Sequence, residues 1–278
     1  MTTLVIGARG HVGSAVVTGL LAAGEAVRAS SRSPLSGGFP EGVEVVHADL
    51  TEPGSWPAAL DGVHKMFLYA HSETAAEFAM AAKNAGVEHV VLLSSVSVLF
   101  PDAATNPIAR RHAAAERALD EAGLNRTFVR PGYFATNTLR WQSIRTERVL
   151  RTAFPNATYS PVHERDIADV AVQLLLDDTR HQNACPVLGA GPTTVREQVA
   201  AIAEALSEPV RLEEVDVDTY RAQLLAELPA FAVEHLIASG GSVPAPPADV
   251  AVDAVPELLG RPASTFAEWA RDHVDDFR

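Results

Sequence analysis

Three glycines near the N-terminus constrain the fold of this chain more than any other feature. Gly7, Gly10 and Gly13 follow an apolar run over residues 3–6 and lead into an apolar-periodic segment over residues 12–23. The run predicts a buried strand and the periodic segment predicts a helix, with a second short strand following it. A strand, a glycine turn, a helix and a strand form the first half of a dinucleotide-binding βαβ unit.

Each glycine has a predicted role in that unit. Gly7 permits the tight turn off the strand, Gly10 lets the backbone approach a pyrophosphate, and Gly13 lets the helix pack against the sheet. The first amide groups of the helix offer hydrogen-bond donors and a positive dipole end to the phosphates. We therefore expect this stretch to bind the pyrophosphate through Gly7, Arg9, Gly10, His11, Val12 and Gly13.

The end of the second strand indicates which nucleotide binds. NAD-binding folds place Asp or Glu there for the ribose 2′-hydroxyl, whereas an arginine accommodates the 2′-phosphate of NADP. Here the stretch contains no carboxylate and reads Ser31, Arg32 and Ser33, with Arg9 as a second candidate cation. The alternative interpretation of Arg32 is a solvated loop residue. The missing acid favours NADP(H).

Strands and helices alternate after this unit, with predicted strands over residues 43–47, 63–69, 90–93 and 126–129. Such alternation predicts an α/β fold with a doubly wound parallel Rossmann-type sheet, whose ligands bind beyond the carboxyl ends of the strands. The candidate cofactor-binding residues at those ends are Asp49, Leu50, Tyr69, Ala70, His71, Ser94 and Pro131. Asp49 is placed to bond the adenine or its ribose, or equally to cap the next helix.

The pattern loosens in the second half of the chain. We expect residues 1–155 to form an NAD(P)-binding Rossmann domain, to which later strands and helices return, and residues 156–278 to form a mixed, small C-terminal substrate lobe. A helix is predicted over residues 136–150. The proline- and glycine-rich stretch 240–247 is a candidate lid over the nucleotide cleft.

Composition excludes several classes of protein. The 278 residues carry 22 basic and 35 acidic side chains, a net charge of −13 that argues against nucleic-acid binding. The single Cys185 excludes an internal disulfide, and no metal-ligand spacing occurs. No run of 18 apolar residues and no room for a signal peptide are seen, so we expect no membrane span and a cytoplasmic protein.

Five stretches together resemble one family: GARGHVG, VRASSRSP, VVLLSSVSV, HAAAERALDEAGLNRTFVRPGYF and ERDIADVAVQLL. In this order the chain is similar to the NmrA-like, atypical short-chain dehydrogenase/reductases with an NAD(P)-binding Rossmann fold. The resemblance covers roughly residues 3–176. It implies a Rossmann-type sheet, bound NADP(H) and a small C-terminal lobe for substrate.

The resemblance also implies catalytic positions, which this chain fills unusually. Relatives place Ser or Thr after the fifth strand, and Ser95 matches this position. They also carry a Tyr-x-x-x-Lys pair on the next helix, with an acidic residue four positions after the lysine, and Glu116 matches that acidic residue. His112 then stands at the lysine position and Ile108 at the tyrosine position. The usual proton donor is absent, which puts ordinary ketone chemistry in doubt.

Several residues are candidates for the missing function. His112 could donate the proton, hold the nicotinamide ribose, or point outward from a solvated helix face. Tyr133, just after the sixth strand, could face the nicotinamide or serve as a packing aromatic. Glu164 and Asp166, at the start of a predicted helix, suit its positive N-terminus.

Two functions remain compatible with these residues. The first is an NADPH-dependent reductase of a small organic acceptor: a quinone, an enone, an imine or an activated carbonyl. The second is a non-catalytic redox sensor that binds NADP(H) and acts through a protein partner, since one fold hosts both. The apolar helices could also support a homodimer.

Overall fold

The computed structural model describes residues 1–33, 38–177, 184–242 and 253–278. The chain divides into two compact units. The first contains Met1–Gly132, Glu164–Val187 and Pro246–Arg261, and the second contains Tyr133–His163, Leu188–Ala245 and Pro262–Arg278. The chain therefore passes between the units several times. The division into domains at residue 155 stays a prediction, because a compact unit need not fold independently.

The first unit is built on a parallel sheet of seven strands in the order β3-β2-β1-β4-β5-β6-β9. The strands are β1 (Thr2–Val5), β2 (Ala26–Ser31), β3 (Glu44–His47), β4 (Val63–Tyr69), β5 (His89–Leu93), β6 (Arg126–Pro131) and β9 (Ala184–Val187). The predicted doubly wound Rossmann-type sheet is confirmed. Strand β9 comes later in the chain than the first segment of the second unit. It belongs to the first unit and pairs with β6 at the edge of this sheet.

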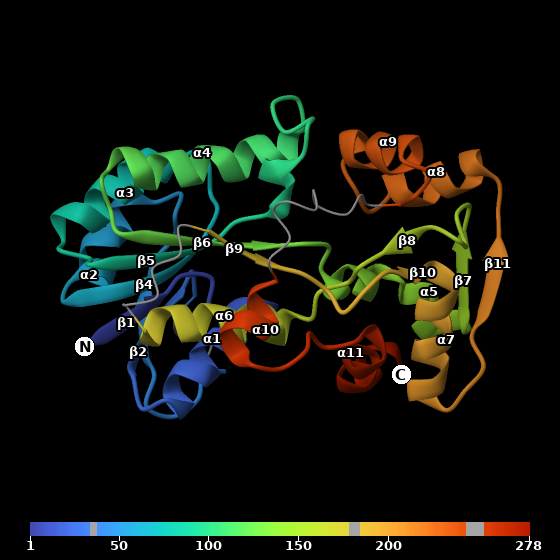
Figure 1. Cartoon of the computed structure of the whole chain (residues 1–278), viewed down its shortest axis with the longest axis horizontal. Helices are drawn as coiled ribbons and strands as arrows, with labels where there is room; N and C mark the ends of the chain where they lie inside the picture. The colour runs from blue at the N-terminus through green and yellow to red at the C-terminus, as the bar shows by residue number, and fades with distance from the viewer. Residues whose placement is uncertain (34–37, 178–183, 243–252) are drawn as a thin grey trace. The chain divides into compact units, whose positions relative to one another are not determined.

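Helices cover both faces of this sheet (Figure 1). One face carries α2 (Trp56–Leu60), α3 (Ala75–Asn84) and α4 (Pro107–Glu121); the other carries α1 (His11–Ala22), α6 (Glu164–Leu176) and α10 (Ala254–Leu259). Alternate apolar strand residues pack beneath them, and Trp56 meets Phe78 edge to face at 5.2 Å. Helices α1 and α6 pack closely at Gly19, which has no side chain. A Cβ at that position would lie only 2.9 Å from the Val172 side chain.

The strand order places a crevice at a defined point of the sheet. The chain runs outward from β1 through β2 to β3, then returns to β4 on the other side of β1. Connections leave β1 and β4 in opposite directions, so the carboxyl ends of these two strands border the crevice where doubly wound sheets bind ligands. The glycine turn and Tyr69 follow those two strands.

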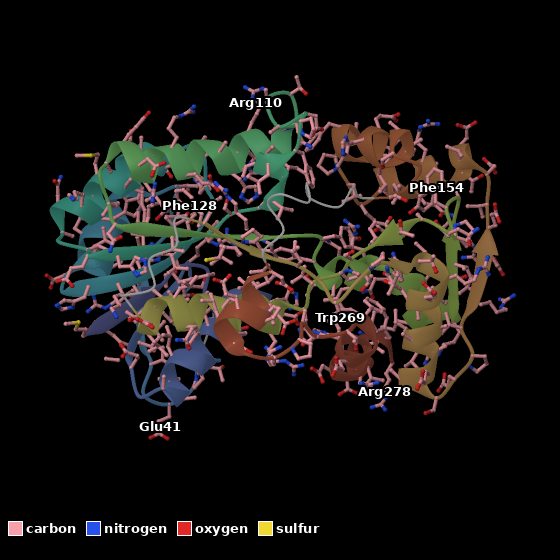
Figure 2. The ribbon with its side chains drawn as sticks, in the orientation of Figure 1. Glu41, Arg110, Phe128, Phe154, Trp269 and Arg278 are labelled. Carbon is pink, nitrogen blue, oxygen red and sulfur yellow. The ribbon has the colours of Figure 1, made fainter. Side chains whose placement is uncertain are left out.

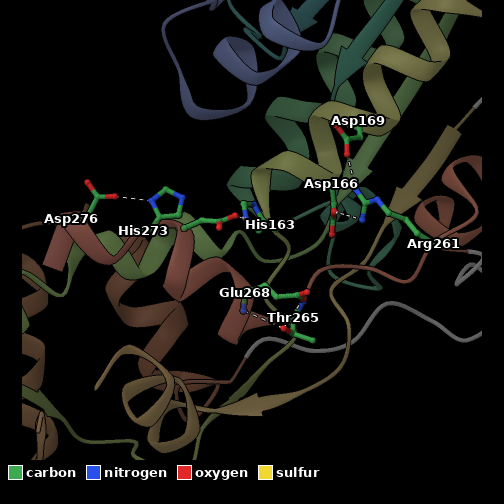
Figure 3. Close-up of polar contacts among 9 residues, drawn as sticks. His163, Asp166, Asp169, Arg261, Thr265, Glu268, His273 and Asp276 are labelled. Carbon is green, nitrogen blue, oxygen red and sulfur yellow. Dashed lines mark hydrogen bonds and ion pairs between the residues drawn. The ribbon is translucent and has the colours of Figure 1, made fainter. Parts of the chain in front are cut away.

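One arginine links helix α6 to the segment that follows α10 through two ion pairs. Arg261 binds the carboxylate of Asp166 at 2.8 Å and that of Asp169 at 2.6 Å (Figure 3). The Asp166 side chain is only 1% exposed. The buried Asp166 carboxylate therefore pairs with a partly exposed arginine, in addition to lying in the first turn of α6 as predicted.

The second unit has short strands and a larger share of helix. Strands β8 (Thr158–Tyr159) and β10 (Thr193–Thr194) pair antiparallel, and β7 (Val149–Thr152) and β11 (Arg211–Glu214) pair parallel. Its helices are η4 (Ala135–Arg140), α5 (Gln142–Glu147), α7 (Val195–Leu206), α8 (Val217–Leu225), α9 (Ala230–Ala238), α11 (Phe266–Asp272) and η6 (Val274–Phe277). Trp269, labelled in Figure 2, is fully buried in this unit's core.

The helix predicted over residues 136–150 is confirmed only in part. The segment contains η4 and α5, and α5 ends at Arg148, whose φ of 55° is left-handed. The Arg148 guanidinium donates to the carbonyls of Ile144 and Phe277, and strand β7 starts at the next residue. Contacts with the C-terminus, remote in sequence, therefore override the local helical pattern.

Other predictions from the sequence have mixed outcomes. Cys185 is a buried thiol in β9, and burial raises its pKa to about 11. Of the candidate lid over residues 240–247, the positions from 243 onward lie outside the described residues. No helix within the described ranges is both long and apolar enough to cross a membrane.

Candidate dinucleotide and catalytic site

The glycine turn leaves no room for a side chain at Gly7 or at Gly13. Gly7 has a φ of +76°, and its amide donates to the Ser30 hydroxyl at 3.2 Å. The Gly10 amide donates to the Gly7 carbonyl at 2.9 Å. A Cβ at Gly13 would stand 2.2 Å from that same carbonyl oxygen. Gly13 therefore allows the helix to pack against the turn itself, which corrects the expectation that it packs against the sheet.

The start of α1 is arranged as an anion site. Gly10 is the N-cap, it supplies no side-chain hydrogen bond, and the first turn, with His11, Val12 and Gly13, holds no acidic residue. The positive end of the helix thus lies beside a glycine-rich turn whose backbone a ligand can approach closely. A pyrophosphate fits this chemistry, because its oxygens need amide donors and close backbone approach.

Cationic and hydroxyl side chains gather at the end of β2. Arg9 donates from Nε to the Ser31 hydroxyl at 3.1 Å, and its guanidinium lies 4.8 Å from the centre of the Phe39 ring. The Ser31 hydroxyl also accepts the Ser33 amide at 3.1 Å. Arg32 is exposed. The arrangement fixes Arg9 in the place expected for a 2′-phosphate contact and contains no carboxylate at the end of β2.

Asp49 follows β3 and shapes its own turn. One carboxylate oxygen accepts both the amide and the hydroxyl of Thr51 at 2.8 Å. These hydrogen bonds lower the pKa of Asp49, and the positive charge of Arg32 lowers it further. The carboxylate therefore stays ionised and closes the turn after β3. The N-caps of η2 (Pro53–Ser55) and α2 are Glu52 and Ser55, so the prediction that Asp49 caps the next helix is wrong, and its contact with the adenine or ribose stays a prediction.

A small apolar recess of about 10 Å³ opens beyond β4 within the first unit. Leu50, Tyr69, His71 and Phe78 are among its lining residues, and Ala70 lies between two of them. The Thr74 hydroxyl holds this loop by donating to the Leu50 carbonyl at 2.7 Å and by pairing with the His71 ring at 3.0 Å. The structure thus gathers three predicted cofactor-binding residues, Leu50, Tyr69 and His71, around one apolar recess.

A buried polar network joins the ends of β5 and β6 to α4. Glu116 accepts two hydrogen bonds from Arg130, at 2.8 and 2.6 Å, and one from the Ser94 hydroxyl at 2.6 Å. Ser94 and Glu116 are 2% and 7% exposed. Pro131 follows Arg130 and is buried. The network anchors Ser94 and the end of β6 at the carboxyl edge of the sheet.

The catalytic positions implied by the resemblance lie on and beside α4. Ser95 caps the turn η3 (Val96–Leu99), its hydroxyl accepting the Ser97 amide at 3.2 Å. His112 is half-buried, and its Nδ1 is buried with no hydrogen-bond partner among the described residues. Burial lowers the pKa of His112, against the opposing effect of Glu116. Ile108 is exposed, at 47%.

Tyr133 begins the second unit and is described within it. Its ring lies 4.5 Å from that of Tyr159, at an interplanar angle of 33°. Burial raises the pKa of Tyr133 to about 12, although the nearby Arg140 charge opposes this. Tyr133 therefore keeps its proton at neutral pH.

Sequence reasoning missed several residues that lie beside the predicted ones within each unit. Arg130 adjoins the predicted Pro131, and Glu116 stands out in the sequence only through the family pattern, so their pairing carries no local signal. Phe39, Tyr159 and Arg140 reach their neighbours only through the tertiary fold. No metal-like group of three or more His, Cys, Asp or Glu side chains occurs in the part of the chain that the structure describes.

Comparison with known proteins agrees with this geometry. The NAD(P)H-binding family model matches residues 7–178. The chain is 37% identical over 282 residues to (4-alkanoyl-5-oxo-2,5-dihydrofuran-3-yl)methyl phosphate reductase of Streptomyces griseus, covering 99% of this chain and 98% of that protein. It is 33% identical over 288 residues to NAD(P)H azoreductase of Xenophilus azovorans, covering 99% and 98%.

A solved structure shares the fold over the whole length. Triphenylmethane reductase from Citrobacter sp., complexed with NADP(H), superposes with a TM-score of 0.76 at 22% identity. The match covers 99% of this chain and 100% of the other. At this identity the likeness establishes the fold.

Proposed function

Because this chain belongs to the NAD(P)H-binding family, we propose that it is an NADPH-dependent reductase of electron-poor conjugated double bonds. Its predicted place among the NmrA-like, atypical short-chain dehydrogenase/reductases is confirmed. The named relatives are oxidoreductases. What remains to be assigned is the acceptor and the work of individual side chains.

The residues around the glycine turn support NADPH as the hydride donor. The bare turn and the start of α1 would hold the pyrophosphate, and Arg9 and Arg32 would bind the 2′-phosphate beside Ser31. Leu50 and the residues that follow β4 would lie beside the adenine, at the carboxyl edge of the sheet. When bound, the cofactor supplies the hydride, and this chain supplies orientation and exclusion of water.

The names of the two relatives support the acceptor class. A 4-alkanoyl-5-oxo-2,5-dihydrofuran carries a carbon–carbon double bond conjugated to carbonyl groups, and an azo compound carries a conjugated nitrogen–nitrogen double bond. Both accept a hydride at one end of a polarised double bond. For an enone, the hydride adds to the β-carbon, the electron pair moves to the carbonyl oxygen, and a proton then reaches the α-carbon.

One observation carries this choice: an exposed isoleucine, Ile108, stands where the family's tyrosine would be. A simple ketone needs a proton on oxygen as the hydride arrives, so it needs a positioned acid. A conjugated acceptor instead spreads the charge over an enolate or hydrazide. Solvent or a weaker donor can protonate that anion afterwards.

Three residues are proposed to assist. The buried Nδ1 of His112 lacks a partner among the described residues, which fits a hydrogen bond to the nicotinamide ribose. The Ser95 hydroxyl oxygen accepts a hydrogen bond from the Ser97 amide, and its own proton would be donated to the substrate. Tyr133 is protonated at neutral pH and is the candidate donor to the developing oxyanion.

Steady-state oxidation of NADPH and NADH tests the proposal. The acceptors are an acyl-substituted cyclic enone, a quinone, an azo dye and, as matched control, the saturated ketone of the same ring. We expect oxidation with the conjugated acceptors, little with the ketone, and loss of the preference for NADPH in Arg32→Glu. Reduction of the ketone at a comparable rate would contradict the acceptor class. Tight NADPH binding with no oxidation by any acceptor would favour the sensor function instead.

A further inference from the structure

Two residues between β2 and β3 lie against a side chain of the glycine turn, within the first unit. Gly38 has a φ of +90°, a left-handed backbone that favours glycine, and Phe39 follows it. The Arg9 guanidinium lies 4.8 Å from the centre of the half-buried Phe39 ring. A Cβ at Gly38 would lie 3.7 Å from Nη1 of the same arginine, an ordinary contact. The chain therefore returns after β2 to touch Arg9.

The contact between Arg9 and Phe39 is a cation–π interaction. A guanidinium within about 6 Å of a ring centre is attracted by the electrons of the ring face. Arg9 is exposed, and an exposed arginine samples many side-chain conformations, which a ligand must reduce when it binds. A ring that already holds the guanidinium lowers this entropic cost. Phe39 therefore orders Arg9 before any ligand binds.

The Ser31 hydroxyl is the second group that orders Arg9. Its oxygen accepts hydrogen bonds from Arg9 Nε and from the Ser33 amide, both at 3.1 Å. A serine hydroxyl has two acceptor lone pairs and one proton to donate. Both acceptor positions of Ser31 are thus filled, and the residue is only 4% exposed. Within the described ranges the hydroxyl donates to no acceptor, so its proton is available to a ligand.

These groups suit an oxyanion at the end of β2. The strand ends at Ser31, and its sequence contains no carboxylate. A group that bridges the Arg9 guanidinium and the Ser31 hydroxyl proton needs two acceptor oxygens and gains from a negative charge. The 2′-phosphate of NADP(H) offers both, whereas the 2′-hydroxyl of NAD(H) offers one uncharged oxygen. The position of Arg9 therefore matters for one nucleotide and little for the other.

We propose that Phe39 is a positioning residue for the 2′-phosphate of the cofactor and that it acts by holding Arg9 beside Ser31. The inference rests on the proposed function, because it assigns a residue to the preference for NADPH. Phe39 itself would contact no reacting atom. It changes which nucleotide binds, and hydride transfer from a bound nucleotide is unaffected. All three side chains belong to the first unit.

Binding without turnover tests this role, with NADP⁺ and NAD⁺ as the probes because they differ only in the 2′-phosphate. Both are titrated by calorimetry. Phe39→Leu keeps an apolar side chain and removes the ring, so NADP⁺ should bind about 5-fold more weakly and NAD⁺ within about 2-fold of the wild type. Phe39→Tyr restores the ring and should restore the NADP⁺ affinity. Phe231→Leu, which changes an exposed phenylalanine of α9, should match the wild type for both nucleotides.

A double-mutant cycle tests whether Phe39 acts through the arginine. Arg9→Gln should weaken NADP⁺ binding by about 10-fold or more, because a charge-assisted hydrogen bond is lost. In that background, Phe39→Leu should change the NADP⁺ affinity by less than about 2-fold, since the ring has no guanidinium to hold. A full 5-fold effect of Phe39→Leu in the absence of Arg9 would contradict the positioning role.

The two affinities together distinguish the possible failures. Equal losses of NADP⁺ and NAD⁺ affinity in Phe39→Leu would mean that the ring only supports the fold of the turn, and this would overturn the inference. If the wild type prefers NADP⁺ and Phe39→Leu retains that preference, the positioning role fails while the proposed dependence on NADPH stands. If the wild type binds both nucleotides equally well, the proposed dependence on NADPH fails, and the positioning role fails with it.

Discussion

At the scale of single residues, two glycines of the turn differ in why they must be glycine: one because of the packing of the fold and the other because of the proposed ligand. A Cβ at Gly13 would lie 2.2 Å from the Gly7 carbonyl oxygen, whereas a Cβ at Gly10 would lie 3.4 Å from it, an ordinary contact. Gly10 has a φ of −76°, which any residue adopts. The fold therefore requires glycine at position 13, whereas we propose that only an approaching pyrophosphate would require it at position 10.

Alanine substitutions distinguish these two requirements. Gly13→Ala should lower the free energy of unfolding by about 2–4 kcal/mol, because helix and turn must move apart. Gly10→Ala should unfold at nearly the wild-type urea concentration but bind NADPH at least about 10-fold more weakly. Urea unfolding and fluorescence titration measure both. Equal stability of the two variants would show that the turn is not packed as described.

The sequence predicted this turn because glycines at this spacing, between a strand and a helix, are typical of dinucleotide-binding turns. It also predicted a cationic end of β2 from the missing carboxylate. It could not predict that Arg9 is held by Ser31 and the Phe39 ring, because that contact depends on the path of the chain after β2. Nor could it predict that Gly13 packs against a carbonyl.

At the scale of elements, α4 is tied to the sheet by one carboxylate. Glu116 on α4 accepts hydrogen bonds from Ser94 after β5 and from Arg130 on β6. Its side chain is 10% exposed and that of Arg130 is 16% exposed, so water compensates little for the loss of either. Because α4 also carries His112, the network fixes the position of a proposed catalytic residue.

Substitution of this carboxylate should be costly. Glu116→Gln keeps the shape but leaves the Arg130 charge buried without compensation, so the free energy of unfolding should fall by about 3–5 kcal/mol. The control is Glu121→Gln on the same helix, whose partner Arg117 is 4.0 Å away with both side chains largely exposed. That control should leave urea unfolding unchanged. A stable Glu116→Gln would mean that the network does not hold α4.

Sequence reasoning located most elements of the first unit and fewer of the second. The strand over residues 63–69 has the predicted bounds, because its apolar pattern agrees with its burial. The helix predicted over residues 136–150 is broken by Arg148, whose partners lie elsewhere in the chain. Helices α8 and α9 bury almost no side chains, so they left no periodic signal.

At the scale of the whole molecule, the second unit contributes a distinct response to pH. Burial raises the pKa of Tyr133 to about 12 and also raises that of Tyr159. In the unfolded chain these phenols lose their protons near pH 10, so above that pH the unfolded state binds fewer protons than the folded state. Stability conferred by the neutral phenols is therefore complete below pH 10 and is lost as pH rises towards 12.

Urea unfolding at several pH values tests this response. The free energy of unfolding should fall steadily between about pH 10 and pH 12. Tyr133→Phe should make that fall shallower, since one of the shifted groups is removed. Tyr133→Phe with an unchanged pH dependence would contradict the burial of this phenol.

Hydride transfer itself is the most direct test of the central claim, an NADPH-dependent reductase of conjugated double bonds. NADPH carrying deuterium at the transferable position is incubated with the protein and an acyl-substituted cyclic enone, and the product is analysed by mass spectrometry and NMR. The account predicts one deuterium on the former β-carbon, an intact carbonyl, and a proton from solvent on the α-carbon. Deuterium on the carbinol carbon of a reduced carbonyl, or NADPH oxidation without label in the product, would contradict it.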